Sequence, residues 1–129
     1  MRRLALTCLA VAVLAAGCGE DDDEQPAAAP ALADLRVHVD PDGKGGRPAR
    51  NTTVRCSSAE ESPLCEKVAA LRLADIEPPS RATACTELYG GPQTATITGT
   101  LRGRRIDLKL SRVNGCEIAR WEAARALLK

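Results

Sequence analysis

Hydrophobic and polar residues alternate along several short stretches of the chain, and such alternation predicts strands with one buried face. Four stretches have this pattern or a β-branched composition: residues 35–39, 52–56, 94–101 and 106–110. Gly103 lies in the short gap between the last two stretches, so these two are expected to form a hairpin. His38, the one histidine of the chain, falls on the polar side of the first stretch and is interpreted as a solvated residue.

Apolar residues at helical spacing predict two helices. The first begins at Ser62 and Pro63, an N-cap residue followed by a proline at the first helical position, and stops before Pro78. Its apolar face consists of Leu64, Val68 and Leu71. The second helix lies at the C-terminus, with an apolar face of Ile118, Trp121, Ala124 and Leu128. Strands in two groups with helices between them predict an α+β fold, an antiparallel sheet with helices on one face.

The N-terminal residues have the features of a bacterial export signal. A short positive segment precedes an apolar run over residues 4–16, which is too short to span a bilayer. The string Leu-Ala-Ala-Gly-Cys ending at Cys18 resembles the lipobox of bacterial lipoproteins, which implies a signal peptide over residues 1–17 and acylation of Cys18. We therefore expect an exported, extracytoplasmic protein that is lipid-anchored to a bacterial membrane. An ordinary secretory signal cut near the same alanines would leave it secreted.

Residues 18–33 are predicted to be a tether, because an acidic run over residues 20–24 precedes a Pro-Ala stretch without any apolar period. The folded domain is then expected over residues 34–129. The whole chain has 129 residues, a net charge of +1 and 2% aromatic residues. Clustered bases and stacking aromatics are missing, which disfavours a nucleic-acid partner.

The same composition argues against several kinds of catalytic chemistry. With His38 as its one histidine, the chain cannot build a metal site from several histidines, and a histidine-based triad is hard to place. No nucleophile motif and no paired carboxylates in a plausible cleft are visible. We expect no enzymatic activity, no cofactor and no metal.

Four cysteines remain after the signal peptide and the acylated residue are set aside: Cys56, Cys65, Cys85 and Cys116. An even number in a small exported domain predicts two disulfides. None of the four is part of a Cys-x-x-Cys pair, which disfavours zinc. Spacing alone leaves three connectivities open.

The stretch from Cys85 to Ile118 resembles the Streptomyces subtilisin inhibitor family of serine-protease inhibitors. It carries the strings Cys-Thr-Glu-Leu-Tyr-Gly-Gly-Pro at 85–92 and Asn-Gly-Cys-Glu at 114–117, separated by the predicted hairpin. The family has a Cys-Pro-x-x-Tyr-Asp-Pro loop, a hairpin of similar length and an Asn-x-Cys close. The order of strands and cysteines agrees with the family over about residues 34–122.

This resemblance implies a sheet of about five antiparallel strands with two helices on one face, and usually a homodimer. It also implies the disulfides Cys56–Cys65 and Cys85–Cys116. The inhibitory loop of the family lies just after the third cysteine of the domain. Thr86 stands where the family has proline, and Gly90–Gly91 stand for a single aspartate, which is expected to lengthen and loosen the loop.

Carried onto this chain, the family pattern implies a scissile bond between Glu87 and Leu88, with Glu87 entering the primary pocket of the protease. The other loop residues are Ala84, Cys85 and Thr86 on the acyl side and Tyr89 on the leaving side; Asn114 would hydrogen-bond the loop backbone from behind. The implied partner is an extracellular serine protease of subtilisin-like or chymotrypsin-like fold that accepts glutamate. The alternative is a non-inhibitory envelope lipoprotein, a binding or structural module that keeps the fold.

Overall fold

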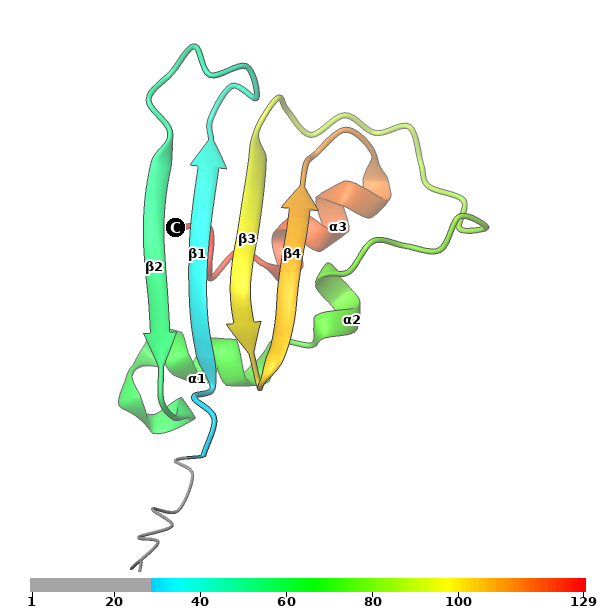
Figure 1. Cartoon of the computed structure of the whole chain (residues 1–129). Helices are drawn as coiled ribbons and strands as arrows, with labels where there is room; N and C mark the ends of the chain where they lie inside the picture. The colour runs from blue at the N-terminus through cyan, green and yellow to red at the C-terminus, as the bar shows by residue number, and fades with distance from the viewer. Residues whose placement is uncertain (1–28) are drawn as a thin grey trace, which may run out of the picture.

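The computed structural model describes residues 29–129, so the predicted signal peptide, Cys18 and most of the predicted tether lie outside the described residues. A four-stranded antiparallel sheet forms one layer, in the order β2-β1-β3-β4 (Figure 1). Its strands are β1 (Ala33–Asp40), β2 (Arg50–Cys56), β3 (Thr94–Leu101) and β4 (Arg104–Leu110). Within residues 29–129, no helix is long and apolar enough to cross a membrane.

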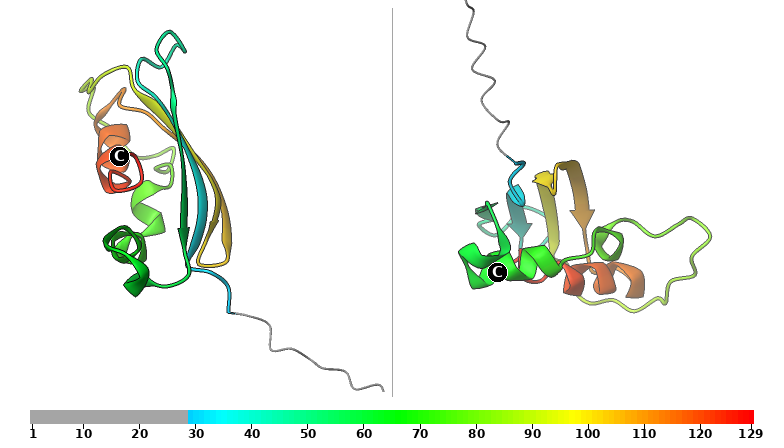
Figure 2. Two further views of the ribbon diagram at one scale, coloured as in Figure 1. Left: turned by 90° about the vertical axis from the view of Figure 1, so that its left-hand side faces the viewer. Right: turned by 90° about the horizontal axis from the view of Figure 1, so that it is seen from below.

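Helices form the second layer, and all of them lie on one face of the sheet (Figure 2). They are the 3-10 helix η1 (Ala59–Glu61) and the α-helices α1 (Pro63–Ala70), α2 (Leu73–Ile76) and α3 (Gly115–Ala123). The α+β class and the antiparallel sheet are thus confirmed. The expected counts of five strands and two helices are wrong, since the described residues form four strands and three α-helices.

The additional helix arises because the expected first helix is interrupted at Leu71, whose backbone is extended. Leu71 and Leu73 both pack against the core. Two residues apart on one continuous helix, they would point to nearly opposite sides. The break lets both leucines reach the core. The fifth strand is absent because the C-terminal residues after β4 form α3 and further turns, which bury Leu127 and Leu128.

The core lies between the two layers and follows the alternation of the strands. Register places Val37 opposite Ile97, and Ile97 opposite Leu108, so one row of aliphatic side chains crosses three strands. All but one of the buried residues are aliphatic or cysteine, and Trp121 packs partly buried against them. His38 is exposed on the opposite face, where its Nδ1 lies 2.8 Å from Asn51 Oδ1, as expected for a solvated strand histidine.

Two local features confirm the predicted boundaries. Ser62 caps α1, because its Oγ accepts a hydrogen bond from the Cys65 amide at 3.1 Å, and a proline follows it. Arg102 and Gly103 form the hairpin turn with φ of +49° and +75°, as a type I′ turn requires. The guanidinium of Arg102 then donates to three carbonyls at the end of α1, those of Val68, Ala69 and Leu71.

Both disulfides are present with the implied pairing. Cys56–Cys65 joins the end of β2 to α1 and is buried in the core. Cys85–Cys116 joins the segment before β3 to the first turn of α3 and is half-buried. The first bond braces the scaffold, and the second fixes a loop on it.

Candidate functional site

A long irregular segment over residues 77–93 connects α2 to β3 and passes outside β4 to the N-terminal end of α3 (Figure 1). The expected loop residues lie in the middle of this segment: Ala84, Cys85, Thr86, Glu87, Leu88 and Tyr89. Cys85 is half-buried by its disulfide, and the other five are exposed. The segment has no ladder of its own, so its shape depends on contacts with the turn between β4 and α3.

Three contacts hold the stretch from Cys85 to Gly90 on residues 112–116, the anchoring turn, which includes the first residues of α3. The Cys85–Cys116 disulfide has a Cα–Cα distance of 5.4 Å. The Thr86 carbonyl accepts a hydrogen bond from the Gly115 amide at 2.9 Å, and the Gly90 amide donates to the Arg112 carbonyl at 2.7 Å. The chain between Thr86 and Gly90 is therefore held at both ends by one short turn.

The three residues between these anchors, Glu87, Leu88 and Tyr89, point their side chains into solvent. Leu88 is 64% exposed and Tyr89 is 68% exposed. The one other large hydrophobic residue with such exposure in the described part of the chain is Val113, at 56%, and it lies in the anchoring turn. Exposed apolar residues on a loop and on the turn that anchors it are typical of an interaction surface. Sequence reasoning missed Val113, because a lone valine after a strand carries no signal.

Glycines let the loop approach the turn closely. A Cβ on Gly115 would lie 2.1 Å from Thr86 Oγ1, and one on Gly90 would lie 2.9 Å from Ile118 Cγ1. Gly91 has a φ of +130°, and a Cβ there would lie 2.3 Å from Gln93 Oε1. The Gly90–Gly91 pair, expected to loosen the loop, is thus packed against neighbouring side chains.

Asn114 lies behind the loop, but its side chain acts locally. Its Oδ1 accepts a hydrogen bond from the Glu117 amide at 2.9 Å and caps α3. The hydrogen bond from this turn to the loop backbone comes from the neighbouring Gly115 amide. Asn114 therefore fixes the helix start that carries the Gly115 donor, and its side chain hydrogen-bonds to α3 and not to the loop backbone.

A buried ion pair holds α3 beneath the loop. Arg120, 6% exposed, lies 2.7 Å from a Glu117 carboxylate oxygen and also donates to the carbonyls of Ile76 and Lys109. These bonds tie α3 to α2 and β4, so the anchoring turn has a fixed position. A buried arginine with carboxylate and carbonyl partners is satisfied rather than free for chemistry. The pattern of Glu117 three residues before Arg120 is the sequence signal that indicates the pair.

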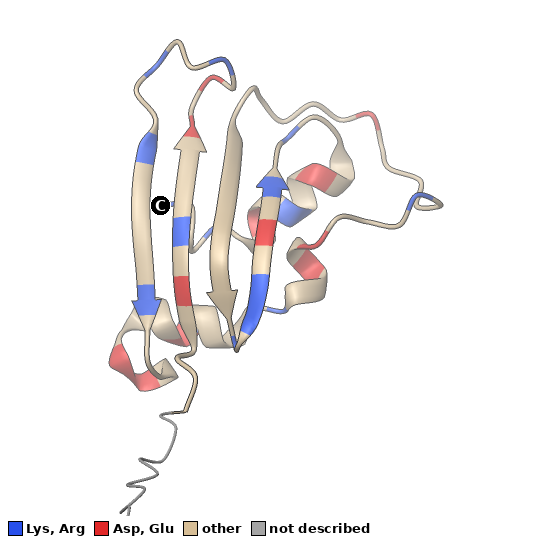
Figure 3. Ribbon diagram, in the orientation of Figure 1, with Lys and Arg blue, Asp and Glu red and all other residues tan. Residues whose placement is uncertain are grey.

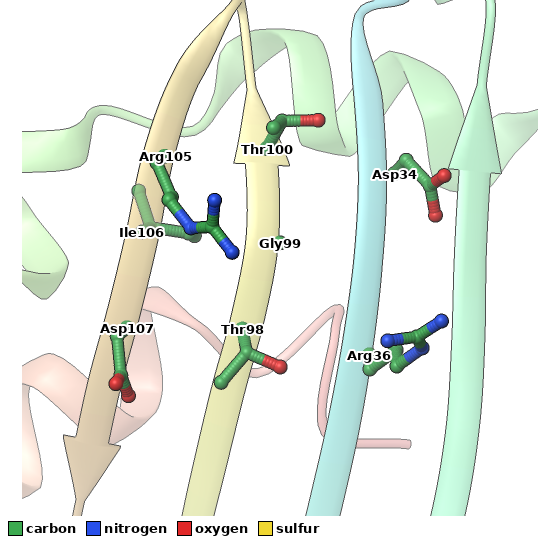
Figure 4. A pocket seen from close by; sticks show the side chains of 8 residues that line it. All are labelled: Asp34, Arg36, Thr98, Gly99, Thr100, Arg105, Ile106 and Asp107. Carbon is green, nitrogen blue, oxygen red and sulfur yellow. The ribbon is translucent and has the colours of Figure 1, made fainter.

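A separate hollow lies on the outer face of the sheet, away from the loop (Figure 4). It measures about 310 Å³ and lies over Gly99; four charged side chains surround it, Asp34 and Arg36 from β1 and Arg105 and Asp107 from β4. Charges of both signs occur across this face (Figure 3). Within residues 29–129, no group of three or more histidine, cysteine or acidic side chains is placed to hold a metal.

Comparison with known proteins adds nothing to this geometry, since no family model, curated protein or solved structure matches the chain. The description of the site therefore rests on the residues of this chain alone. It belongs to a disulfide-braced α+β domain that displays a three-residue arch, Glu87 to Tyr89, held at both ends.

Proposed function

We propose that this chain inhibits extracellular serine endopeptidases by presenting residues 84–89 as a substrate-like loop, with Glu87–Leu88 as the scissile bond. One observation carries the proposal: Glu87, Leu88 and Tyr89 are exposed between two backbone anchors on the same turn, beside a disulfide to that turn. The proposal assigns the chain no catalytic activity, cofactor or metal. Its partner is a protease.

The anchored loop supports inhibition because little backbone freedom remains to be lost on binding. A flexible peptide loses conformational entropy when a protease holds it extended, whereas a preorganised loop has already lost it on folding. Contacts of Leu88, Tyr89 and Val113 with the protease then contribute to affinity. A tyrosine and aliphatic side chains exposed together are typical of such contact surfaces.

The same anchors explain why cleavage would not release the loop. Cutting Glu87–Leu88 leaves the acyl side held by the Cys85 disulfide and the Thr86 carbonyl. The leaving side stays held by the Gly90 amide. The new amine of Leu88 therefore remains beside the acyl-enzyme at a high effective concentration, which favours re-formation of the bond.

Glu87 directs the proposal toward a glutamate-accepting protease. A carboxylate that enters an apolar pocket loses its hydration without gaining a partner. A pocket that carries its own acid repels it. A pocket with cationic groups or strong hydrogen-bond donors offers a charge-assisted contact, which contributes about 1.5–3 kcal/mol.

In this proposal the protein acts outside the cytoplasm. Two disulfides in a small domain are typical of exported proteins. The proposal includes acylation of Cys18 and a homodimer like that of the inhibitor family. Acyl labelling of the wild type and of Cys18→Ala tests the first, and size-exclusion chromatography tests the second.

A panel of purified serine proteases tests the function. The domain is titrated against a glutamate-specific, a subtilisin-like and a trypsin-like enzyme, and the bond cleaved is identified by mass spectrometry. We expect tight inhibition of the glutamate-specific enzyme with slow cleavage at Glu87–Leu88. No complex with any enzyme at micromolar protein would leave the chain as a non-inhibitory module that keeps the fold.

A further inference from the structure

Arg112, at the first position of the anchoring turn, contacts the loop through both its backbone and its side chain. Its carbonyl accepts the 2.7 Å hydrogen bond from the Gly90 amide. Its Nη1 donates to Gln93 Oε1 at 3.3 Å, and its Cζ lies 5.9 Å from the centre of the Trp121 ring. One residue thus contacts the loop at Gly90 and at Gln93 and rests on α3.

The charge of Arg112 is not used in an ion pair. None of the salt bridges formed within residues 29–129 includes it, and its Nε is buried without a hydrogen-bond partner. Placing a guanidinium there has a cost, because part of its hydration is lost without a carboxylate. The contacts that offset this cost are the indole ring of Trp121 and the Gln93 carboxamide.

The Gln93 carboxamide in turn packs beside the loop backbone at Gly91. Its oxygen would lie only 2.3 Å from a Cβ on Gly91, so the Gln93 side chain lies close against the glycine. Gly91 has a φ of +130°, which other residues rarely adopt. Arg112 therefore acts on the loop from Gly90 to Gln93 in two ways. Its carbonyl binds the Gly90 amide, and its guanidinium holds the Gln93 side chain against Gly91.

We infer that Arg112 is a positioning residue for the leaving side of the loop. It fixes residues 90–93, so that the chain after the scissile bond stays in place whether or not the bond is intact. This last consequence rests on the proposed function. With residues 90–93 held in place, the chain would act as a lasting inhibitor. Without that order, the protease would slowly consume it as a substrate.

The first experiment measures loop order without any serine protease. Thermolysin, a zinc enzyme, digests the folded protein, and mass spectrometry times the cuts within residues 87–93. Hydrogen exchange follows the Gly90 amide in parallel. Removing the charged donor in Arg112→Met is expected to raise both rates roughly tenfold, the factor expected for one hydrogen bond to a charged group. Arg112→Lys keeps a cation over Trp121 and is expected to restore most of the protection.

Matched controls separate positioning from general stability. Arg105→Met removes an arginine of the same sheet edge that faces the outer hollow, and it should leave both rates unchanged. Gln93→Ala removes the same contact from the loop side and tests the inference if Arg112→Met does not fold. Rates for Arg112→Met and Gln93→Ala equal to wild type would overturn the inference. Equal acceleration in Arg105→Met would also overturn it.

The second experiment uses any protease that the wild type inhibits. Arg112→Met is expected to bind with similar initial affinity but to be recovered cleaved, whereas wild type is recovered mostly intact. Intact recovery of Arg112→Met would overturn the role in retention. If wild type inhibits no protease while the thermolysin and exchange rates rise as expected, the proposed function fails and the positioning role stands.

Discussion

Gly115 is the residue whose missing side chain most directly shapes the loop. A Cβ there would lie 2.1 Å from Thr86 Oγ1, so Gly115→Ala has to displace Thr86 or stretch the 2.9 Å hydrogen bond to its carbonyl. Overpacking of this kind costs about 1–3 kcal/mol. We expect a lower midpoint in urea and faster thermolysin cleavage of the loop. Adding Thr86→Ala removes the clashing oxygen and should restore both; if the double variant is no better than Gly115→Ala, the clash is not the cause.

On the proposed inhibitory function, Glu87 would decide which protease the loop fits. Glu87→Met should gain inhibition of a subtilisin-like enzyme, because an apolar side chain enters an apolar pocket without losing a charge's hydration. Glu87→Lys should gain inhibition of a trypsin-like enzyme, whose pocket acid pairs with the new cation. Both variants should no longer inhibit the glutamate-specific enzyme. Glu66→Lys, an exposed change on α1, is the control and should leave inhibition unchanged. If neither Glu87 variant inhibits the subtilisin-like or the trypsin-like enzyme, Glu87 is not the primary contact.

At the scale of elements, the hairpin turn also closes a helix. Arg102 has a φ of +49°, unusual for a residue with a side chain, and it donates to the carbonyls of Val68, Ala69 and Leu71 at 3.2, 2.5 and 2.8 Å. Arg102→Gly keeps the turn but loses these bonds, and we expect a loss of about 1–3 kcal/mol in urea denaturation. Arg102→Ala should lose roughly 1 kcal/mol more, from the left-handed backbone. A fully stable Arg102→Gly would contradict the capping role.

The two disulfides are expected to differ in how readily they are reduced. Cys56 and Cys65 are 1% and 2% exposed, whereas Cys85 and Cys116 are half-buried at the surface. Thiol attack requires access to a sulfur. Mild dithiothreitol followed by alkylation and peptide mapping should therefore label Cys85 and Cys116 first. The unfolded protein, in which both pairs label together, is the control, and earlier labelling of Cys56 would reverse the assignment.

The elements that sequence reasoning found are those with local causes. The four strands follow from alternation, and the start of α1 follows from Ser62 and Pro63. The fifth strand had no alternating stretch behind it and came from the family resemblance alone. The break at Leu71 was missed because its carbonyl is held by Arg102, which lies 31 residues away. The loop residues are an expectation from the resemblance alone, and their anchors depend on contacts across the fold, which the sequence does not show.

At the scale of the whole molecule, the sheet separates the end where the chain enters from the end that carries the loop. β1 begins at Ala33, beside Leu101 at the end of β3, whereas Thr94 at the start of β3 lies beside Asp40. The loop is anchored just after the end of β4, at the same end as Thr94 (Figures 1 and 2). Strands of eight residues separate the two ends by roughly 25 Å. If the predicted tether before β1 holds the domain at a surface, the loop would lie on the far side from that surface.

This arrangement predicts how the site of attachment affects capture of a protease. The domain is coupled to beads by a short linker through Ala31→Cys, before β1, or through Lys44→Cys, in the exposed connection between β1 and β2. That connection lies at the loop end, since a Cβ on its Gly43 would lie 2.3 Å from the Pro92 carbonyl oxygen. Beads coupled at residue 31 should capture an inhibited protease as fully as the free domain does, because the bead lies at the opposite end. Beads coupled at residue 44 should capture less, because the bead obstructs the approach of the enzyme. Equal capture from both sites, with both variants equally inhibitory in solution before coupling, would show that the loop end is not the face that meets the protease.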